Sequence, residues 1–293
     1  MLPKDLLSQV KKIEIRTRRI VDEITAGAYH SVFKGRGIEF DEVREYTPED
    51  DVRDIDWNVT ARMGAPYIKK YVEERELTVI MAVDLSASAT FGSTGNTKMR
   101  MATELAALLA FSAIRNNDRV GLLTFTDRVE FYLPPKSGKS HGLRLIRELM
   151  VRDPEGTGTD ISLALNHIMR VVHKKAVIFL ISDLINDSNF ANILTIVNKR
   201  HDVVIVRTLD PIELTLPATG NICIEDAETG EIAAVNAASK SFLKRYSQAA
   251  QDIHNNNQEI CKRAKADLID IRCGEDIVKP LVSFFKKRQT KSS

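Results

Sequence analysis

A carboxylate and two hydroxyls follow the first long apolar run of the chain. The sequence MAVDLSASAT places Asp84, Ser86 and Ser88 in a D-x-S-x-S arrangement at the end of the run LTVIMAV. Carboxylate and hydroxyl oxygens are hard donors, and a hard cation such as Mg²⁺ takes about six oxygen ligands. Three ligands are too few, so we expect other loops to contribute to the same site.

Two further oxygen donors stand at comparable positions later in the chain. TGTDISLAL places Thr159 at the start of a predicted helix, and FLISDL places Asp183 at the end of a predicted strand. In open α/β sheets, ligands bind outside the carboxyl ends of the strands. Together with the first motif, these residues predict a site for Mg²⁺ or Mn²⁺. The alternative is that the hydroxyls cap helices and the aspartates close turns.

These candidate ligands need a scaffold, and from Leu77 onward the sequence alternates apolar runs with helical patterns. Strands are predicted over 77–84, 119–127, 129–134, 176–183, 202–210 and 267–273, and helices over 99–116, 142–150, 161–174, 189–200, 238–265 and 277–288. The run 77–83 is apolar throughout, as in a parallel strand buried on both faces, so we expect it at the centre of a sheet. The alternation predicts an α/β fold, with an open, mostly parallel, Rossmann-like sheet covered by helices on both faces.

The residues before this alternation read differently. Residues 1–75 are predicted to form a helix over 5–25 and a small loop-rich layer. Short strands are expected near Glu39–Val43 and Tyr67–Val72, and Trp57 is expected to anchor the layer in a core. The acidic and basic side chains between those strands predict Arg–carboxylate pairs that hold the layer together, with a second cation site as the alternative.

The second predicted domain, residues 76–293, is interrupted within 211–235. There, Glu228-Thr229-Gly230 separates two β-like runs, Ile222–Ile224 and Ile232–Val235. A turn sequence between two such runs predicts a β-hairpin insertion.

Composition excludes several classes of function. The chain has 42 Lys+Arg against 40 Asp+Glu, with a net charge of +2 and both signs interspersed, which argues against a nucleic-acid binder. No apolar run approaches the roughly 18–20 residues that span a bilayer, so no membrane span is predicted. The first twenty residues lack the apolar core of a secretory signal. Three cysteines without a close pair fit a reducing compartment, so the protein is expected in the cytoplasm.

The five candidate ligands, taken across three strand-end loops, resemble the metal-ion-dependent adhesion site of von Willebrand factor type A domains. Asp84, Ser86 and Ser88 are similar to its first motif, Thr159 to its second-loop threonine and Asp183 to its third-loop aspartate. The resemblance implies an incomplete metal shell that a carboxylate from a protein partner completes.

A second resemblance lies in the residues upstream of the first apolar strand. They are similar to the signature of a bacterial and archaeal family known as domain of unknown function fifty-eight: Gly27, His30, Ser31, Gly35, Gly37, Glu39, Phe40, Arg44, Tyr46, Asp50, Asp51, Arg53, Ile55, Asp56, Trp57, Ala61 and Arg62. Members of that family carry a type A domain and are typically encoded beside MoxR-type AAA+ ATPases. The resemblance covers residues 20–290 and implies that the partner is a MoxR-type ATPase or a client that it remodels.

The function expected from these observations is a non-enzymatic, metal-dependent protein-binding module. A Mg²⁺-dependent hydrolase that uses the same carboxylates is the alternative. Such an enzyme needs a base or nucleophile near the metal, whereas Ser86 and Ser88 are better placed as ligands and no His follows in the strand-end loops. A scaffold with a vestigial site is disfavoured, since all five ligand positions are intact.

Overall fold

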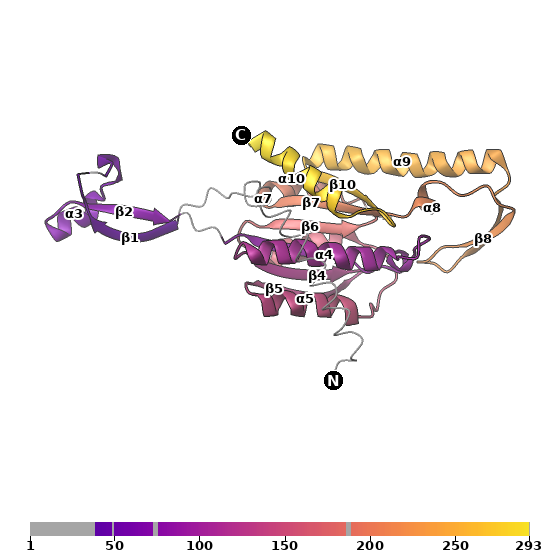
Figure 1. Ribbon diagram of the computed structural model, residues 1–293, viewed down its shortest axis with the longest axis horizontal. Coiled ribbons are helices and arrows are strands. Elements are labelled where there is room, and N and C mark those ends of the chain that lie inside the picture. Colours follow the sequence, from indigo (N-terminus) through magenta and orange to yellow (C-terminus); the bar gives the residue numbers. More distant parts are fainter. Residues whose placement is uncertain (1–38, 49, 73–75, 186–188, 293) are drawn as a thin grey trace. The chain divides into compact units, whose positions relative to one another are not determined.

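The computed structural model describes residues 39–48, 50–72, 76–185 and 189–292. The chain divides into two compact units, with one boundary of the smaller unit at residue 34 and the other at residue 76 (Figure 1). The helix predicted over residues 5–25 lies outside the described residues. The predicted division of the chain at residue 75 therefore stays a prediction.

The smaller unit is built on an antiparallel pair of strands, β1 (Glu39–Glu45) and β2 (Tyr67–Val72). Both strands lie where the sequence predicted them. The connection contains the 3-10 turn η1 (Val52–Asp54) and the short helix α3 (Trp57–Met63). Gly64 ends α3 with a φ of 77°, a left-handed conformation that glycine adopts without strain.

Acidic residues organise the connection between these two strands. Arg44 donates to both carboxylate oxygens of Asp50, at 2.9 and 2.6 Å, and this pairing lowers the pKa of Asp50 to about 2. Asp51 caps η1, and Asp56 caps α3 by accepting from the backbone N–H of Asn58 at 3.0 Å. These carboxylates therefore serve Arg pairing and helix capping, as expected for a charged layer with little apolar core.

The prediction that Trp57 is a core anchor is wrong. Its side chain is 67% exposed at the first position of α3. Of the side chains described in this unit, Ile68 and Asp56 are the buried ones. A two-stranded sheet with one short helix encloses little volume. It buries the side chain of Ile68 in β2, whereas the larger ring of Trp57 stays exposed.

Six strands of the larger unit form its main sheet, in the order β10-β7-β6-β3-β4-β5. Their bounds are β3 Thr78–Asp84, β4 Arg119–Phe125, β5 Val129–Lys136, β6 Val177–Ser182, β7 Asp202–Leu209 and β10 Asp267–Arg272. All neighbours pair in parallel except β4 and β5, which are antiparallel. β3 lies between β6 and β4, and its residues from Val79 to Asp84 are buried. The predicted mostly parallel sheet with this strand inside it is confirmed.

Helices cover both faces of the sheet (Figure 1). Their bounds are α4 Lys98–Arg115, α5 Lys139–Val151, α6 Ile161–Val171, α7 Ala191–Arg200, α9 Lys240–Ala264 and α10 Val278–Ser292. Val79, Met81 and Val83 share one core with α4, α5 and α10, whereas Ile80 and Ala82 share the other with α6, α7 and the end of α9. Alternate residues of one strand thus supply opposite cores, as strand geometry requires.

The segment between β7 and α9 differs in part from the prediction. Residues Pro211–Leu214 form the short helix α8, because Asp210 and Glu213 make a capping box around a proline at the first turn. The predicted hairpin follows, with β8 (Asn221–Glu225) antiparallel to β9 (Ile232–Asn236).

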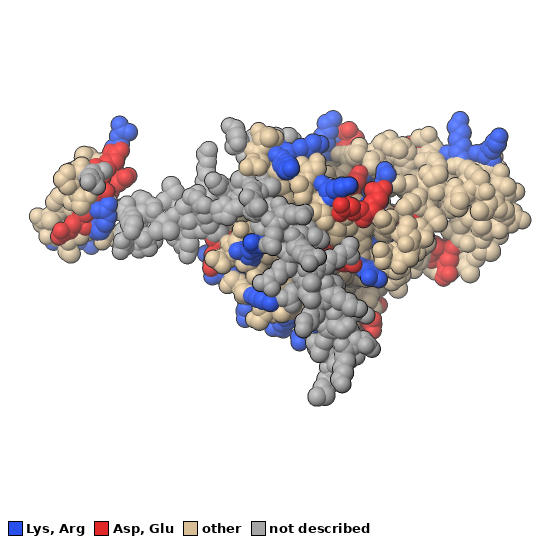
Figure 2. Space-filling view, in the orientation of Figure 1, with Lys and Arg blue, Asp and Glu red and all other residues tan. Residues whose placement is uncertain are grey.

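Two surface properties complete the description. Among the described side chains on the visible face, Lys and Arg lie interspersed with Asp and Glu (Figure 2). Within the described ranges, no helix combines the length and the apolar character needed to cross a membrane.

Candidate metal centre

Asp84 is the last residue of β3 and is held from two sides. Its Oδ1 accepts from the backbone N–H of Ser86 at 2.9 Å, and its Oδ2 accepts from the hydroxyl of Ser182, at the end of β6, at 2.7 Å. The residue is 3% exposed. Burial, and then the nearby carboxylate of Asp183, raise the pKa of Asp84 to about 6. A carboxyl group in this environment is stabilised in its ionised form by an added positive charge.

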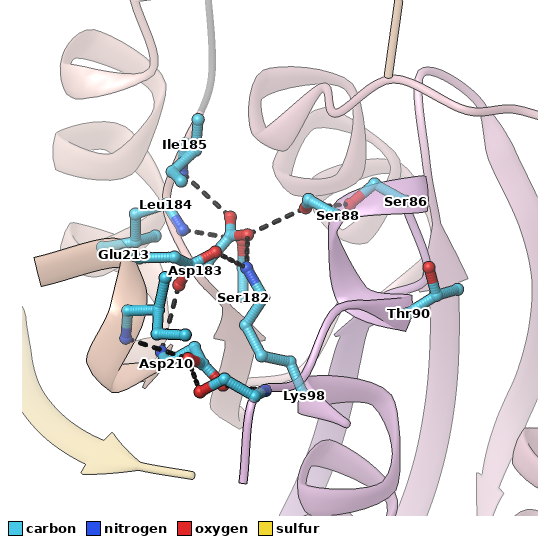
Figure 3. Close-up of polar contacts among 12 residues, drawn as sticks. Ser86, Ser88, Thr90, Lys98, Ser182, Asp183, Leu184, Ile185, Asp210 and Glu213 are labelled. Carbon is cyan, nitrogen blue, oxygen red and sulfur yellow. Dashed lines mark hydrogen bonds and ion pairs between the residues drawn. The ribbon is translucent and has the colours of Figure 1, made fainter. Parts of the chain in front are cut away.

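The two serines connect Asp84 with Asp183. Ser86 precedes the 3-10 turn η2 (Ala87–Thr90), and its Oγ lies 3.1 Å from the Oγ of Ser88. The hydroxyl of Ser88 donates to Oδ2 of Asp183 at 2.8 Å (Figure 3). Four of the five predicted ligands therefore form one continuous polar cluster at the carboxyl ends of two adjacent parallel strands.

The turn after Asp183 fixes the direction of its carboxylate. Oδ1 of Asp183 accepts from the backbone N–H of Ile185 at 3.0 Å. Leu184 between them is buried and has a φ of 61°, in the left-handed region that residues with a Cβ rarely adopt. Asn257 of α9 donates to the carbonyl of Leu184 at 3.3 Å. Backbone strain held in place by such contacts is a feature of functional sites.

Lys98 is a component of the cluster that the sequence did not predict. Its side chain is 1% exposed, and its Nζ donates to Oδ2 of Asp183 at 2.7 Å and forms an ion pair with Glu213 of α8 (Figure 3). Burial lowers the pKa of Lys98, but the charges of Asp183 and Glu213 outweigh burial and raise it above its ordinary value. The side chain is therefore a permanent ammonium. Arg100, two residues further along α4, has a side chain that is 66% exposed. The difference in burial between these two basic residues comes from how α4 packs on the rest of the protein.

Thr159 lies in the loop before α6, and backbone contacts dock that loop on its neighbours. The carbonyl of Thr157 accepts from the backbone N–H of Ala87 in the serine loop at 2.9 Å, and the backbone N–H of Asp160 donates to the carbonyl of Thr126 at 2.9 Å. The hydroxyl of Thr159 itself donates to Oε1 of Glu228, in the turn between β8 and β9, at 2.9 Å. The loop of the fifth predicted ligand thus adjoins the serine loop, while the threonine hydroxyl is bonded to the hairpin.

The approach of this loop to β4 depends on Gly156. A Cβ at this position would lie 2.2 Å from Oγ1 and 2.9 Å from Cβ of Thr126, a fully buried residue. The backbone N–H of Gly156 donates to Oε1 of Glu130 at 2.9 Å. The loop therefore reaches its position only because residue 156 has no side chain.

A cavity of about 10 Å³ lies within the cluster, lined by residues that include Asp84, Ser86, Ser88, Lys98 and Asp183. That volume is close to what one water-sized species needs. The arrangement offers two buried carboxylates and neutral hydroxyls around this space. Oxygen donors of this kind suit a hard divalent cation.

Comparison with known proteins places the chain among relatives that carry no assigned activity. Residues 42–256 match the family described as "Protein of unknown function DUF58". The uncharacterized protein Rv1480 of Mycobacterium tuberculosis is 27% identical over 286 residues, which is 97% of this chain and 90% of the relative. An uncharacterized protein of Mycobacterium avium, MAV169, is 24% identical over 54% of this chain and 94% of the relative.

Solved structures of other proteins share the fold. The conserved hypothetical protein BatB from Bacteroides thetaiotaomicron has a TM-score of 0.50 at 20% identity, over 73% of this chain and 99% of that chain. An aerotolerance-related membrane protein from Bacteroides fragilis has a TM-score of 0.51 at 19% identity, over the same shares. Since the family match spans most of the sequence, the chain belongs to the DUF58 family.

Proposed function

We propose that this protein is a metal-dependent protein-binding module of the cytoplasm. In this proposal Asp84, Ser86, Ser88, Thr159 and Asp183 hold one Mg²⁺ or Mn²⁺ ion. The observation that carries it is the cluster of two buried carboxylates joined through serine hydroxyls at the ends of adjacent strands. The resemblance to the adhesion site of type A domains points to the same role.

The donor set fits a hard cation, and its charges suggest what the ion would attract. The serine and threonine hydroxyls are neutral, and the negative charge of Asp183 is already shared with the ammonium of Lys98. The protein therefore offsets only part of a divalent charge. When bound, the ion would supply a residual positive charge that attracts a carboxylate. A partner that presents an exposed Asp or Glu is the class of ligand that such a site recognises.

The groups around the cluster favour binding over hydrolysis. A metal-dependent hydrolase needs a base or nucleophile beside the ion. Lys98 is a basic group that contacts the cluster, and its two ion pairs keep it protonated. Ser86 and Ser88 are engaged with each other and with Asp183. Their roles are those of ligands and of a scaffold for Asp183.

The partner that we propose is a MoxR-type AAA+ ATPase, or a client protein that it remodels. This proposal rests on the family setting implied by the sequence. The GxxxxGK[ST] phosphate-binding loop does not occur in the chain, so ATP hydrolysis would belong to the partner.

Surface plasmon resonance of a MoxR-type ATPase over the immobilised protein tests this function. Wild type should bind in Mg²⁺ and dissociate in EDTA, and Ser86→Ala should dissociate faster, since the metal contact is short-ranged. Thr90→Ala is the matched control, because Thr90 is an exposed hydroxyl of the same turn that donates to the carbonyl of Ala87. If all three proteins bound the ATPase equally in Mg²⁺ and in EDTA, the metal site would not be part of the recognition surface.

A further inference from the structure

A charged amine lines the cavity in which the metal ion is proposed to lie. The Nζ of Lys98 donates to Oδ2 of Asp183 at 2.7 Å, and the hydroxyl of Ser88 donates to the same oxygen at 2.8 Å (Figure 3). The other oxygen of Asp183, Oδ1, accepts from the backbone N–H of Ile185 at 3.0 Å. Both oxygens of this carboxylate are therefore already bonded, one of them to a positive charge.

The cavity has room for a single small species. Its volume is about 10 Å³, and its lining includes Lys98 together with four of the proposed metal ligands. A cation that bound Oδ2 of Asp183 would lie beside the ammonium of Lys98. Like charges so close together in a poorly solvated place repel each other strongly. The ammonium and a divalent cation therefore compete for one carboxylate oxygen.

A second carboxylate is in place to hold the ammonium away from the metal ligands. Glu213 of α8 forms an ion pair with Lys98, and the side chain of Glu213 is 23% exposed. Its Oε2 accepts from the backbone N–H of Asp210 at 3.0 Å. Tyr246 of α9 fixes α8 in turn, because its hydroxyl donates to the carbonyl of Ile212 at 3.1 Å. Glu213 is thus held in place, whereas the lysine side chain has a flexible stem that can shift between two acceptors.

We propose that Lys98 is an internal cation that closes the metal site, and that the ion binds only when the ammonium withdraws from Asp183 to Glu213. This inference rests on the proposed function, because it takes Asp183 as a metal ligand. A buried ammonium without a counter-charge is costly, and the pair with Glu213 removes that cost. A divalent ion carries twice the charge of the ammonium, so it is favoured at Asp183 once its free concentration is high enough.

The consequence concerns when the site is filled. Because Lys98 competes with the ion, the site binds metal more weakly than its oxygen ligands alone would bind it. The protein then exchanges between a form with Lys98 on Asp183 and a form with metal, and the free concentration of Mg²⁺ or Mn²⁺ sets the ratio of the two. A partner carboxylate, which needs the ion, binds the second form.

Isothermal titration of Mn²⁺ into four proteins tests the competition. They are wild type, Lys98→Met, Glu213→Gln and the double variant that carries both changes. Lys98→Met should bind Mn²⁺ more tightly than wild type, by a factor within the range of roughly 5- to 150-fold that is typical of coupling between two ligands. Glu213→Gln should bind it several-fold more weakly, because Lys98 then loses its second acceptor. Arg100→Met, at an exposed position of the same helix, is the matched control and should equal wild type.

The double variant separates competition from a general change of charge. Lys98→Met removes one positive charge and Glu213→Gln removes one negative charge, so the double variant has the net charge of wild type. If Lys98 competes for Asp183, the double variant should still bind Mn²⁺ at least about 5-fold more tightly than wild type. If net charge alone sets the affinity, the two should bind equally. The double variant also serves where Lys98→Met fails to fold, because it leaves no unpaired charge at position 213.

Nuclear magnetic resonance gives a second readout on the unaltered protein. Scalar coupling across a hydrogen bond reports which carboxyl carbon the Nζ of Lys98 is bonded to. Without metal, coupling to both Asp183 and Glu213 is expected. Saturating Mg²⁺ should abolish the coupling to Asp183 and keep the coupling to Glu213, and a coupling to Asp183 that persists in the Mg²⁺-bound protein would overturn the inference.

The outcomes of the titration distinguish this inference from the proposed function. If wild type binds Mn²⁺ and the double variant binds it no more tightly, the competition is refuted and the metal site stands. If the double variant binds Mn²⁺ and wild type does not, the competition is supported, and the metal-dependent function of the wild-type protein is wrong. If none of the proteins binds Mn²⁺, both the proposed function and this inference are wrong.

Discussion

At the scale of single residues, a buried ammonium sets the charge of the site. Lys98 bridges Asp183, at the end of β6, and Glu213, in α8, so it neutralises part of the negative charge that a metal would otherwise meet. Breaking a buried ion pair on one side leaves an uncompensated charge in a poorly solvated place. The stability of the site without metal therefore depends on this lysine.

We expect Lys98→Met to lower the free energy of unfolding by about 3–5 kcal/mol in EDTA, because two carboxylates lose their counter-charge. Saturating Mg²⁺ should recover part of this loss, since the ion supplies positive charge to Asp183. Arg100→Met is the control, and removing its exposed pair with Glu104 should cost less than about 1 kcal/mol. Urea unfolding with and without Mg²⁺ checks this; equal costs for the two variants would contradict it.

At the scale of the elements, the loop between α5 and α6 positions Thr159 through Gly156. An alanine there meets the buried Thr126, whereas an alanine at Gly158 has Cβ of Asp127 at 3.6 Å as its nearest neighbour, an ordinary contact. The two glycines thus differ in what a methyl group would meet within the same loop.

Gly156→Ala should therefore lower the stability by about 1–3 kcal/mol, as overpacking does, and weaken Mn²⁺ binding by moving the loop. Gly158→Ala should change both much less. Thermal unfolding and Mn²⁺ titration of the two variants measure these effects. Similar losses in both proteins would show that the close approach of Gly156 to Thr126 is unimportant.

The junction between α7 and β7 makes stability depend on pH. Nδ1 of the buried His201 accepts from the backbone N–H of Ala176 at 3.2 Å. Burial, and then the charge of Arg200, lower the pKa of His201 to about 4. An unfolded histidine has a pKa near about 6.5, so between these values the unfolded state binds the extra proton.

The contribution of His201 to stability is therefore fully present above about pH 6.5 and is lost as the pH falls towards 4. His201→Phe, which cannot be protonated, should lose less stability than wild type between pH 7 and pH 4.5. His173→Phe, at an exposed position, should follow wild type. Urea unfolding at each pH gives the slopes, and parallel slopes for wild type and His201→Phe would contradict this expectation.

At the scale of the whole molecule, most of the fold and of the candidate site was predicted from two features of the sequence. These are the pattern of apolar residues and the position of oxygen-bearing residues at strand ends. The apolar run of β3 identified a strand buried on both faces, and oxygen-bearing residues after β3 and β6 met because parallel strands end at one edge. Sequence position alone does not show which side chains close a site from outside the motif. The contact of Lys98 with Asp183 depends on how α4 packs. The contact of Glu228 with Thr159 depends on where the hairpin folds back. Trp57 was misplaced because the size of the core around it was not visible in the sequence.

The central claim is that one divalent cation binds at the ends of β3 and β6. Isothermal titration of Mn²⁺ into wild type and Asp84→Asn tests it most directly, with Asp153→Asn, at an exposed position, as the control. Wild type and Asp153→Asn should bind one ion per chain. Asp84→Asn should bind at least about 100-fold more weakly, since even outer-shell partners of a metal are worth about 10–100-fold. Equal binding by all three proteins, or no binding by wild type, would contradict the account.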